Sequence, residues 1–276
     1  MYKLIIRLFI LFICFIGCSK TLLVEPIEQI EPIELVEPKL EDDKLYSFLK
    51  RVKTDLDIYA DIALKEDLVK FLAHFKDMNN GGKRYYLIER DNITRMIESS
   101  TQRIYSDYIL LDAKGKVIYS RSNNTIFSEI IGRRVNDSSF LPNLLDDNYK
   151  YYISNPLKVS GVNSTKVILV CTKISSPDTF PGFAILQINV GRINSLLEET
   201  EFILDIDGNC LFANEIQNID KPYKYFSHLE LDNLQSAKYN VAEIDKKLSL
   251  IYGSLSTDNI NWILVEEKND STQYKK

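Results

Sequence analysis

The sequence predicts an α+β protein in which a long N-terminal helix precedes two antiparallel-sheet modules in tandem. Residues 41–77 carry apolar side chains at three- and four-residue steps, the pattern of an amphipathic helix. From residue 108 onward, short runs of Ile, Val, Leu, Tyr and Phe alternate with turn residues. Within that part, residues 109–120 (ILLDAKGKVIYS) are repeated as residues 202–213 (FILDIDGNCLFA), so the sheet-forming region contains two related halves.

Each copy of this repeat is predicted to form a β-hairpin. Asp112 aligns with Asp205 and Gly115 with Gly208, and these residue types tolerate the positive φ that tight hairpin turns require. The flanking residues are apolar in both copies. One copy would indicate only a hairpin, whereas two copies indicate two sheet modules of similar design.

The first 17 residues are predicted to be a sorting signal. Lys3 and Arg7 precede or border an apolar run, Leu8–Ile16, which is too short to cross a membrane as a helix. The run ends in a small residue followed by Cys18, which resembles a bacterial lipobox. The resemblance implies cleavage before Cys18 and lipidation of its sulfur, so that acyl chains anchor the protein on a bilayer. A plain secretory signal or an amphipathic anchor is the alternative.

Residues 18–40 are predicted to be the lipidated cysteine and an extended tether. Glu-Pro-Ile-Glu occurs at residues 25–28 and again at 31–34, and proline at this spacing excludes a continuous helix. At about 3.1 Å per residue, such a segment holds a folded part up to roughly 60 Å from the lipid. A disordered tail without a spacing role is the alternative. No later apolar segment has membrane-spanning length, so the chain is not expected to carry a signal across a bilayer by itself.

The net charge argues against two classes of partner. It is −5 at pH 7, and it becomes more negative when the basic residues of the signal are removed. A nucleic-acid partner needs a basic surface, and electrostatic attachment to anionic lipid needs one as well. Neither is therefore predicted, although the 45% apolar content supports a folded core.

The helical part is predicted to cover residues 41–100. One long helix is expected over residues 41–77, and the Asn-Asn-Gly-Gly sequence at 79–82 is expected to end it, because these residues accept a left-handed backbone. A second helical stretch is predicted over residues 85–99.

Strands are predicted to follow in two groups that define the two modules. The first module is placed at residues 101–197 and the second at 198–268, with a tail at 269–276. Residues 175–182 contain prolines, which cannot occupy a central ladder, and are expected to form a loop between two long strands. A short helix is expected at 191–199, and the predicted strands are 108–113, 116–120, 150–154, 165–174, 183–190, 201–205, 209–213, 237–244, 247–254 and 262–266.

Residues 41–268 resemble the double Cache family of extracytoplasmic sensor domains. The resemblance rests on the order of the elements, on residues 132–190 with the Asp-x-x-Gly hairpin before them, and on the final strand at residues 261–265. It implies two PAS-like modules, of which the membrane-distal one, residues 101–197, usually holds a small ligand. The family usually occurs in receptors with a membrane-spanning helix and a cytoplasmic output domain. Because this sequence shows neither, the resemblance implies a separate signalling partner.

The sequence contains no motif that indicates catalysis, a metal site or a cofactor. His74 and His228 have no Cys, Asp or Glu at metal-ligand or catalytic-triad spacing. The segment Asp205–Gly208 resembles the start of a calcium loop, but the later ligands are missing, so a turn is predicted. Cys171 and Cys210 are expected to be small buried side chains, with a disulfide between them as the alternative. The chain is therefore not predicted to be an enzyme.

Candidate ligand-binding residues come from the family resemblance. Amino-acid-binding members carry an Arg-x-Trp-Tyr element after the distal hairpin, whose Arg grips the ligand carboxylate, and an Asp on the last distal strand for the amine. The matching positions here are Ser138–Leu141 and Gln187, so both charged anchors are missing. The resemblance therefore implies a neutral or weakly polar ligand rather than a standard α-amino acid. The predicted lining residues are Tyr108, Phe140, Tyr152, Ser154, Cys171 and Gln187.

Alternatives remain for this set. Ordinary sheet packing is the alternative role for each lining residue, and Arg133 and Arg134 are either a displaced carboxylate clamp or solvent-exposed. A pocket with neither a ligand nor a function is also consistent with the missing anchors.

Two functional hypotheses follow. The first is a lipid-anchored extracytoplasmic sensor that binds a small solute in the distal module and signals through a separate membrane partner. The second is an interaction or structural protein of the cell envelope that uses the same fold without a ligand, through a homodimer or partner contacts. The residue after the lipidated cysteine is Ser19 and not the Asp that resembles an inner-membrane retention signal. The outer membrane is therefore the expected location.

Overall fold

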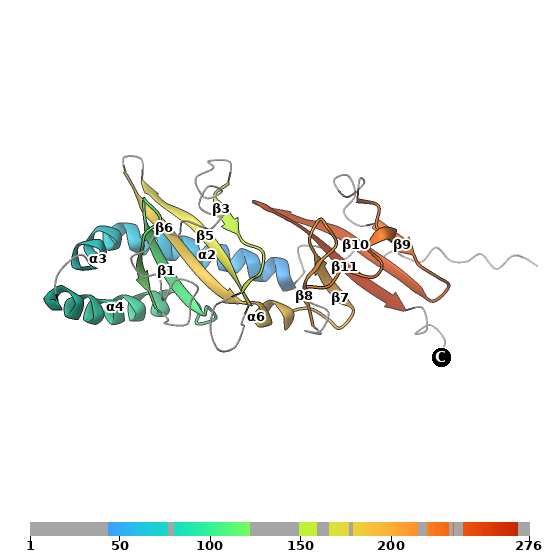
Figure 1. The fold of residues 1–276 in the computed structure, drawn as a ribbon, viewed down its shortest axis with the longest axis horizontal. Coiled ribbons are helices and arrows are strands. Elements are labelled where there is room, and N and C mark those ends of the chain that lie inside the picture. The colour runs from blue at the N-terminus through green and yellow to red at the C-terminus, as the bar shows by residue number, and fades with distance from the viewer. Residues whose placement is uncertain are drawn as a thin grey trace, which may run out of the picture. The chain divides into compact units, whose positions relative to one another are not determined.

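The computed structural model describes residues 44–76, 80–121, 149–158, 166–176, 179–214, 220–231, 234 and 240–269. These residues form three helices followed by two antiparallel sheets (Figure 1). The predicted signal, tether and most of the tail lie outside the described residues. The α+β class and the two sheet modules in tandem are confirmed.

The helical part consists of α2 (Lys44–Lys65), α3 (Leu68–Lys76) and α4 (Asn80–Ser100). The apolar stripe predicted for the leading helix is buried along α2. The single helix expected over residues 41–77 is not confirmed, because Asp67 takes a left-handed backbone (φ 49°) between α2 and α3. The Asn-Asn-Gly-Gly sequence does not end a helix as predicted, since α4 begins within it; its glycines lie in the first turn of α4.

The first sheet has the strand order β2-β1-β6-β5-β3, with β4 pairing to β5. It is followed by the short helix α6 (Val190–Asn194), which lies within the range predicted for a helix except for its first residue. The strands are β1 (Asp107–Asp112), β2 (Val117–Ser120), β3 (Tyr151–Ile153), β4 (Leu157–Lys158), β5 (Lys166–Ser176) and β6 (Thr179–Asn189).

The second sheet has the order β8-β7-β11-β10-β9, which repeats the connectivity of the main path of the first sheet. Each module begins with a hairpin, and the first strand of that hairpin pairs with the last strand of the module. The two long strands of each module pair with each other near the middle of the sheet. The strands are β7 (Glu201–Leu204), β8 (Cys210–Ala213), β9 (Asn240–Glu243), β10 (Leu248–Thr257) and β11 (Ile260–Asn269). This repeated order confirms that the internal repeat marks two modules of one design.

The two repeated hairpins also agree in detail. Asp112 Oδ1 accepts hydrogen bonds from the amides of Lys114 and Lys116 at 2.9 and 2.8 Å. In the second copy, the equivalent oxygen of Asp205 accepts from the amides two and four residues later, at 3.0 and 2.8 Å. Gly115 and Gly208 both have positive φ, 74° and 83°. The aspartates therefore hold turns, as the sequence indicates.

The predicted loop at residues 175–182 is largely strand, which corrects the sequence-based prediction. Strand β5 continues to Ser176 and strand β6 begins at Thr179, so Pro181 lies inside β6. The ladder tolerates this proline because it lies beyond the last β1 pair and beside a shift in the β5–β6 register. The next residue, Gly182, lets β1 approach closely, since a Cβ there would lie 1.9 Å from the Leu111 carbonyl oxygen.

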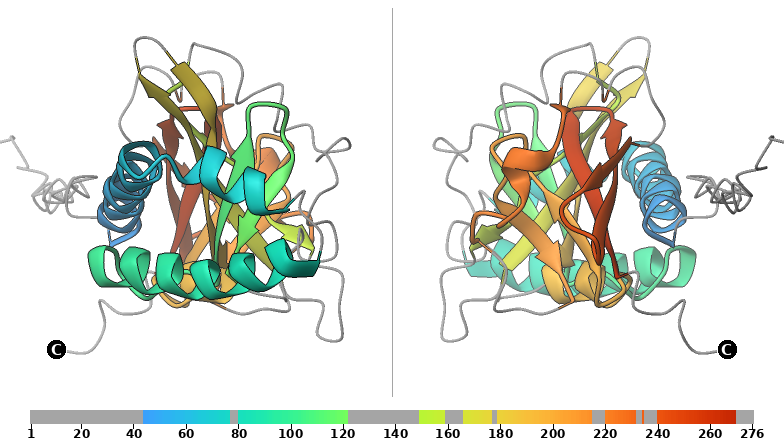
Figure 2. Two further views of the ribbon diagram at one scale, coloured as in Figure 1. Left: turned by 90° about the vertical axis from the view of Figure 1, so that its left-hand side faces the viewer. Right: turned by 90° about the vertical axis from the view of Figure 1, so that its right-hand side faces the viewer.

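The helices cover one face of the first sheet. Apolar residues of α2, α3 and α4 form one buried cluster with Leu110, Val170 and Leu186 of the sheet. Figure 2 shows these helices at the outside of the sheet. The same cluster continues into Phe212 and Trp262 of the second sheet. The two modules therefore share a hydrophobic core.

Candidate functional site

The first sheet has a second apolar face, opposite the helices, which we call the outer face. Its eight buried residues form a cluster separate from the helix-facing core. Because side chains alternate along a strand, residues two apart share a face. The outer face consists of Ile109, Leu111, Val117, Val167, Leu169, Cys171, Phe183 and Ile185, with Tyr152 and Leu157 packed against it.

The structure brings four of the predicted site residues to this face. Cys171 belongs to its apolar cluster, and Tyr152 packs against it from the edge strand β3. Ser154 follows β3, and its hydroxyl accepts a hydrogen bond from the Leu169 amide at 2.9 Å. Gln187 lies on β6 two residues beyond Ile185, so alternation places its side chain on this face.

Gln187 has a buried side-chain oxygen without a hydrogen-bond partner among the described residues. Its side chain is only 2% exposed, and its Nε2 donates to Ser106 Oγ at 3.0 Å. No described residue donates a hydrogen bond to its Oε1. Leaving a buried acceptor unpaired costs about 1–3 kcal/mol, so this oxygen is an energetically unfavourable group of the sheet as it stands.

Asp107 is a buried carboxylate on the same face that the sequence reasoning missed. It is fully buried and pairs in register with Gln187 on the neighbouring strand. Its carboxylate accepts hydrogen bonds from the Ser120 hydroxyl and the Arg121 amide, each at 2.8 Å, and so holds the end of β2. Its position two residues before Ile109 in an alternating strand was the available signal.

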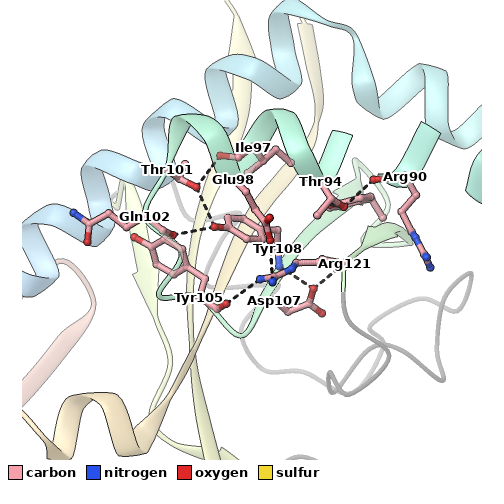
Figure 3. A network of polar contacts seen from close by, with 11 residues as sticks. Arg90, Thr94, Ile97, Glu98, Thr101, Gln102, Tyr105, Asp107, Tyr108 and Arg121 are labelled. Carbon is pink, nitrogen blue, oxygen red and sulfur yellow. Dashed lines mark hydrogen bonds and ion pairs between the residues drawn. The ribbon is translucent and has the colours of Figure 1, made fainter. Parts of the chain in front are cut away.

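Tyr108 lies on the opposite face, so the structure does not bring it together with the other candidates. It is fully buried against the helices, and its hydroxyl donates to the Gln102 carbonyl oxygen at 3.0 Å (Figure 3). The Arg121 guanidinium lies 5.7 Å from its ring centre and forms an ion pair with Glu98 at 2.8 Å. Tyr108 thus belongs to a polar network that joins α4 to β1.

The remaining sequence candidates contribute no new group to the site. Phe140, Arg133 and Arg134 lie outside the described residues. Cys171 and Cys210 are both free, so the alternative of a disulfide between them is excluded. Burial raises the pKa of the Cys171 thiol well above its ordinary value, which keeps this thiol protonated and suits a packing role.

A pocket of about 380 Å³ lies along the free edge of β3, where the second module meets the first. We call it the junction pocket. Ten described residues line it, and its polar and aromatic members are Tyr149, Tyr152 and Asn155 from the first module and Asp205, Asn259, Asn261 and Trp262 from the second. Tyr152 therefore contributes both to the outer face and to the junction pocket.

Two chemical features are not found within the described ranges. No group of three or more His, Cys, Asp or Glu side chains is placed there to hold a metal ion. No helix in the described part of the chain has the length and apolar content needed to cross a membrane.

Comparison with known proteins identifies relatives only at the level of structure. No protein-family model matches the sequence, and no curated protein matches it significantly. An extracellular ligand binding receptor from Desulfohalobium retbaense superposes with a TM-score of 0.55 and 12% identity, covering 81% of this chain. This chain spans only 38% of the length of that receptor.

The alignments with two further structures cover most of this chain and most of the matched domain. The ligand-binding domain of the Pseudomonas fluorescens chemoreceptor CtaA, in complex with L-valine, has a TM-score of 0.52 and 9% identity over 81% of this chain and 90% of its own. A domain of a sensory box/GGDEF family protein from Vibrio parahaemolyticus has a TM-score of 0.50 and 13% identity. The alignment covers 84% of this chain and 96% of that domain. The chain shares its fold with these ligand-binding and sensory domains.

Proposed function

We propose that this protein is a lipid-anchored extracytoplasmic sensor that binds a small neutral or weakly polar solute on the outer face of its distal sheet. The observation that carries the proposal is the buried, unpartnered Oε1 of Gln187. A ligand hydroxyl, amide or amine would complete this acceptor, and the surrounding apolar side chains would desolvate the bond. Most buried polar atoms have a hydrogen-bond partner, so an unpaired one on an apolar face calls for an explanation.

The ligand class follows from the groups on this face. The neighbour CtaA is described in complex with L-valine, an amino acid with a charged amine and carboxylate. Here Gln187 is neutral, and the Asp107 carboxylate beside it already accepts hydrogen bonds from Ser120 and Arg121. A neutral solute with at least one donor therefore matches the uncharged acceptor of Gln187.

Anchoring and signalling are part of the same proposal. Cys18 after the N-terminal apolar run supports attachment to a membrane through acyl chains, with the outer membrane preferred. A protein held on one leaflet has to pass its ligand-bound state to a separate membrane partner. No catalytic step, metal ion or cofactor is part of the proposal.

A thermal-shift screen against neutral solutes, amino acids, polyamines, nucleosides and sugars tests the proposal. A ligand at 100 times its dissociation constant stabilises the fold by about 2.7 kcal/mol, which raises the melting temperature by several degrees. We expect Gln187→Leu to abolish this shift. Asn194→Leu is the matched control, because Asn194 is also a buried side-chain amide with an unpartnered Oδ1, but it lies on α6.

The competing function is a ligand-free interaction protein. It is favoured by exposed apolar side chains on α4, where Tyr85, Leu87 and Ile88 are 62%, 50% and 51% exposed. A folded protein that shows no shift across the panel, or an equal loss of the shift in both variants, would reject the sensor proposal in favour of this one. Pull-downs with Ile88→Asp as the negative control would then test partner binding.

A further inference from the structure

The junction pocket is built on a rigid contact between the two modules. Asn259, in the turn between β10 and β11, accepts a hydrogen bond from the Ile153 amide at 2.6 Å and donates one to the Ile153 carbonyl oxygen at 2.8 Å. One side-chain amide thereby occupies both free backbone groups of this residue at the edge of β3. The turn is held a second time, because Asp258 forms an ion pair with Lys53 of α2 in which both side chains are largely buried.

The opposite wall is fixed in a similar way. Trp262 Nε1 donates to Asn155 Oδ1 at 3.0 Å, and the Trp262 ring packs on Phe212 with ring centres 5.0 Å apart. The walls of the pocket are therefore held before any ligand enters. Such preorganisation lowers the entropic cost of binding a small molecule.

The lining chemistry selects against anionic ligands. None of the ten lining residues is a Lys or Arg, so a phosphate or carboxylate would find no counter-charge among them. Among the ten described lining residues, Asp205 is the single carboxylate. It accepts two backbone hydrogen bonds and a third from Asn209 Nδ2, at 2.9 Å for the last, so much of its acceptor capacity is used within the protein.

The same lining suits a neutral molecule with many hydroxyl groups. A side-chain amide carries two donors and two lone pairs, so Asn155 and Asn259 keep capacity beyond the bonds described above. Tyrosine hydroxyls both donate and accept, so this lining matches ligand hydroxyls, which do both. The rings of Tyr149 and Tyr152 add apolar surface beside these groups. A volume of about 380 Å³ lies within the range of small-molecule sites.

We propose that the junction pocket is a second binding site, for a neutral polyhydroxylated solute of monosaccharide size, separate from the outer face of the distal sheet. This site contacts both modules at once. Its occupancy therefore acts directly on the contact between Asn259 and β3, and Tyr152 also borders the outer face.

Trp262 provides the measurement, because it lines the pocket and is the chain's single tryptophan. Its fluorescence is followed during titration of the full-length protein with D-glucose, D-galactose, D-mannose, D-ribose and myo-inositol. D-glucosamine and D-glucuronate are titrated alongside, since they keep the ring and add one charge of either sign. We expect saturable binding of at least one neutral probe and at least tenfold weaker binding of the matching acidic sugar.

Two variants locate the site. Tyr149→Ala should weaken binding of the neutral probe at least tenfold, whereas Tyr46→Ala should not, because Tyr46 is a similarly exposed tyrosine on α2 that does not line the pocket. Gln187→Leu should leave this binding unchanged, which separates the junction pocket from the outer face.

Three results would overturn the inference. The first is the absence of saturable binding for every neutral probe. The second is equal weakening by Tyr149→Ala and Tyr46→Ala. The third is tenfold tighter binding of glucosamine than of glucose, which would mark a cation site instead.

Discussion

At the scale of single residues, buried polar groups are the most informative part of this molecule. Asp55 of α2 is buried and accepts hydrogen bonds from the Tyr105 hydroxyl at 2.6 Å and the Gln102 amide at 3.2 Å. Asp107 is satisfied in a similar way. Gln187 Oε1 differs because no described group pairs with it, and this contrast is the reason for assigning it a ligand rather than a structural role.

Buried tyrosines give the protein an alkaline limit of stability. Burial raises the pKa of Tyr86 from its ordinary value of 10.0 to about 12, and burial together with an acidic neighbour raises the pKa values of Tyr105 and Tyr223 further. A raised folded-state pKa contributes stability that is complete below the unfolded pKa and is lost as the pH rises toward the folded one. The free energy of unfolding should therefore fall above about pH 10, by about 1.4 kcal/mol per pH unit for each such tyrosine.

Urea unfolding at a series of pH values measures this slope. Tyr86→Phe should make the fall shallower by about one such increment, although it also removes the hydrogen bond to the Ile118 carbonyl oxygen. Tyr85→Phe, at the exposed neighbouring position on α4, is the control and should keep the slope of the parent protein. An unchanged slope in Tyr86→Phe would show that Tyr86 does not contribute to the loss of stability at high pH.

At the scale of elements, the two hairpins show one design in two surroundings. In both, an aspartate side chain holds the turn and a glycine takes the left-handed backbone. The surroundings of the two glycines differ. A Cβ on Gly208 would lie 2.4 Å from the Phe226 ring, whereas no such close approach is found at Gly115 among the described contacts. The second hairpin is thus locked against the residues that follow β8.

Alanine at the two glycines should separate these effects. Gly115→Ala and Gly208→Ala both incur the strain of a left-handed backbone, about 1 kcal/mol. Gly208→Ala also forces the Phe226 ring to move, and overpacking of this kind costs about 1–3 kcal/mol more. Denaturant melts of both variants should show the larger loss for Gly208→Ala, and equal losses would mean that the ring moves at no cost.

At the scale of the whole molecule, the contact at the edge of β3 ties the two modules together. It combines the paired hydrogen bonds of Asn259, the Trp262–Asn155 bond and a core cluster that continues from the helices into the second sheet. Lys166 of β5 also forms an ion pair with Asp220 of the second module. We therefore expect the two modules to unfold as one cooperative unit.

Thermal unfolding should therefore be a single transition, with the same midpoint by Trp262 fluorescence and by far-UV circular dichroism. Asn259→Ala leaves two backbone groups of Ile153 without partners and should cost about 1–3 kcal/mol while separating the two midpoints. Asn209→Ala is the control, because it removes a side-chain bond inside the second module alone. Two midpoints in the unmodified protein would show that the modules unfold independently.

Much of the fold could be predicted because the relevant patterns are local. The apolar stripe of α2 and the alternating strands each repeat over a few residues, and Asp112 and Asp205 mark turns through their own side chains. The features that were not predicted depended on neighbours distant in sequence. Pro181 is tolerated inside β6 because of the β5–β6 register, and Tyr108 faces the helices because of the strand's phase.

The candidate site was predictable only in part. Tyr152, Ser154, Cys171 and Gln187 were found from a family pattern, and the structure places them on one face. Whether a side chain is satisfied is not visible in a sequence, because its partners come from other strands. The free acceptor on Gln187 is such a property.

The sequence by itself determined the α+β class, the tandem hairpins and the order of the elements, since hydrophobic period and turn chemistry act over short spans. Only the tertiary structure decided the break at Asp67, the burial of Asp107 beside Gln187 and the junction pocket at the edge of β3. Each of these arises where segments far apart in the chain pack against one another. Their energies depend on which groups meet there, and no local pattern specifies that.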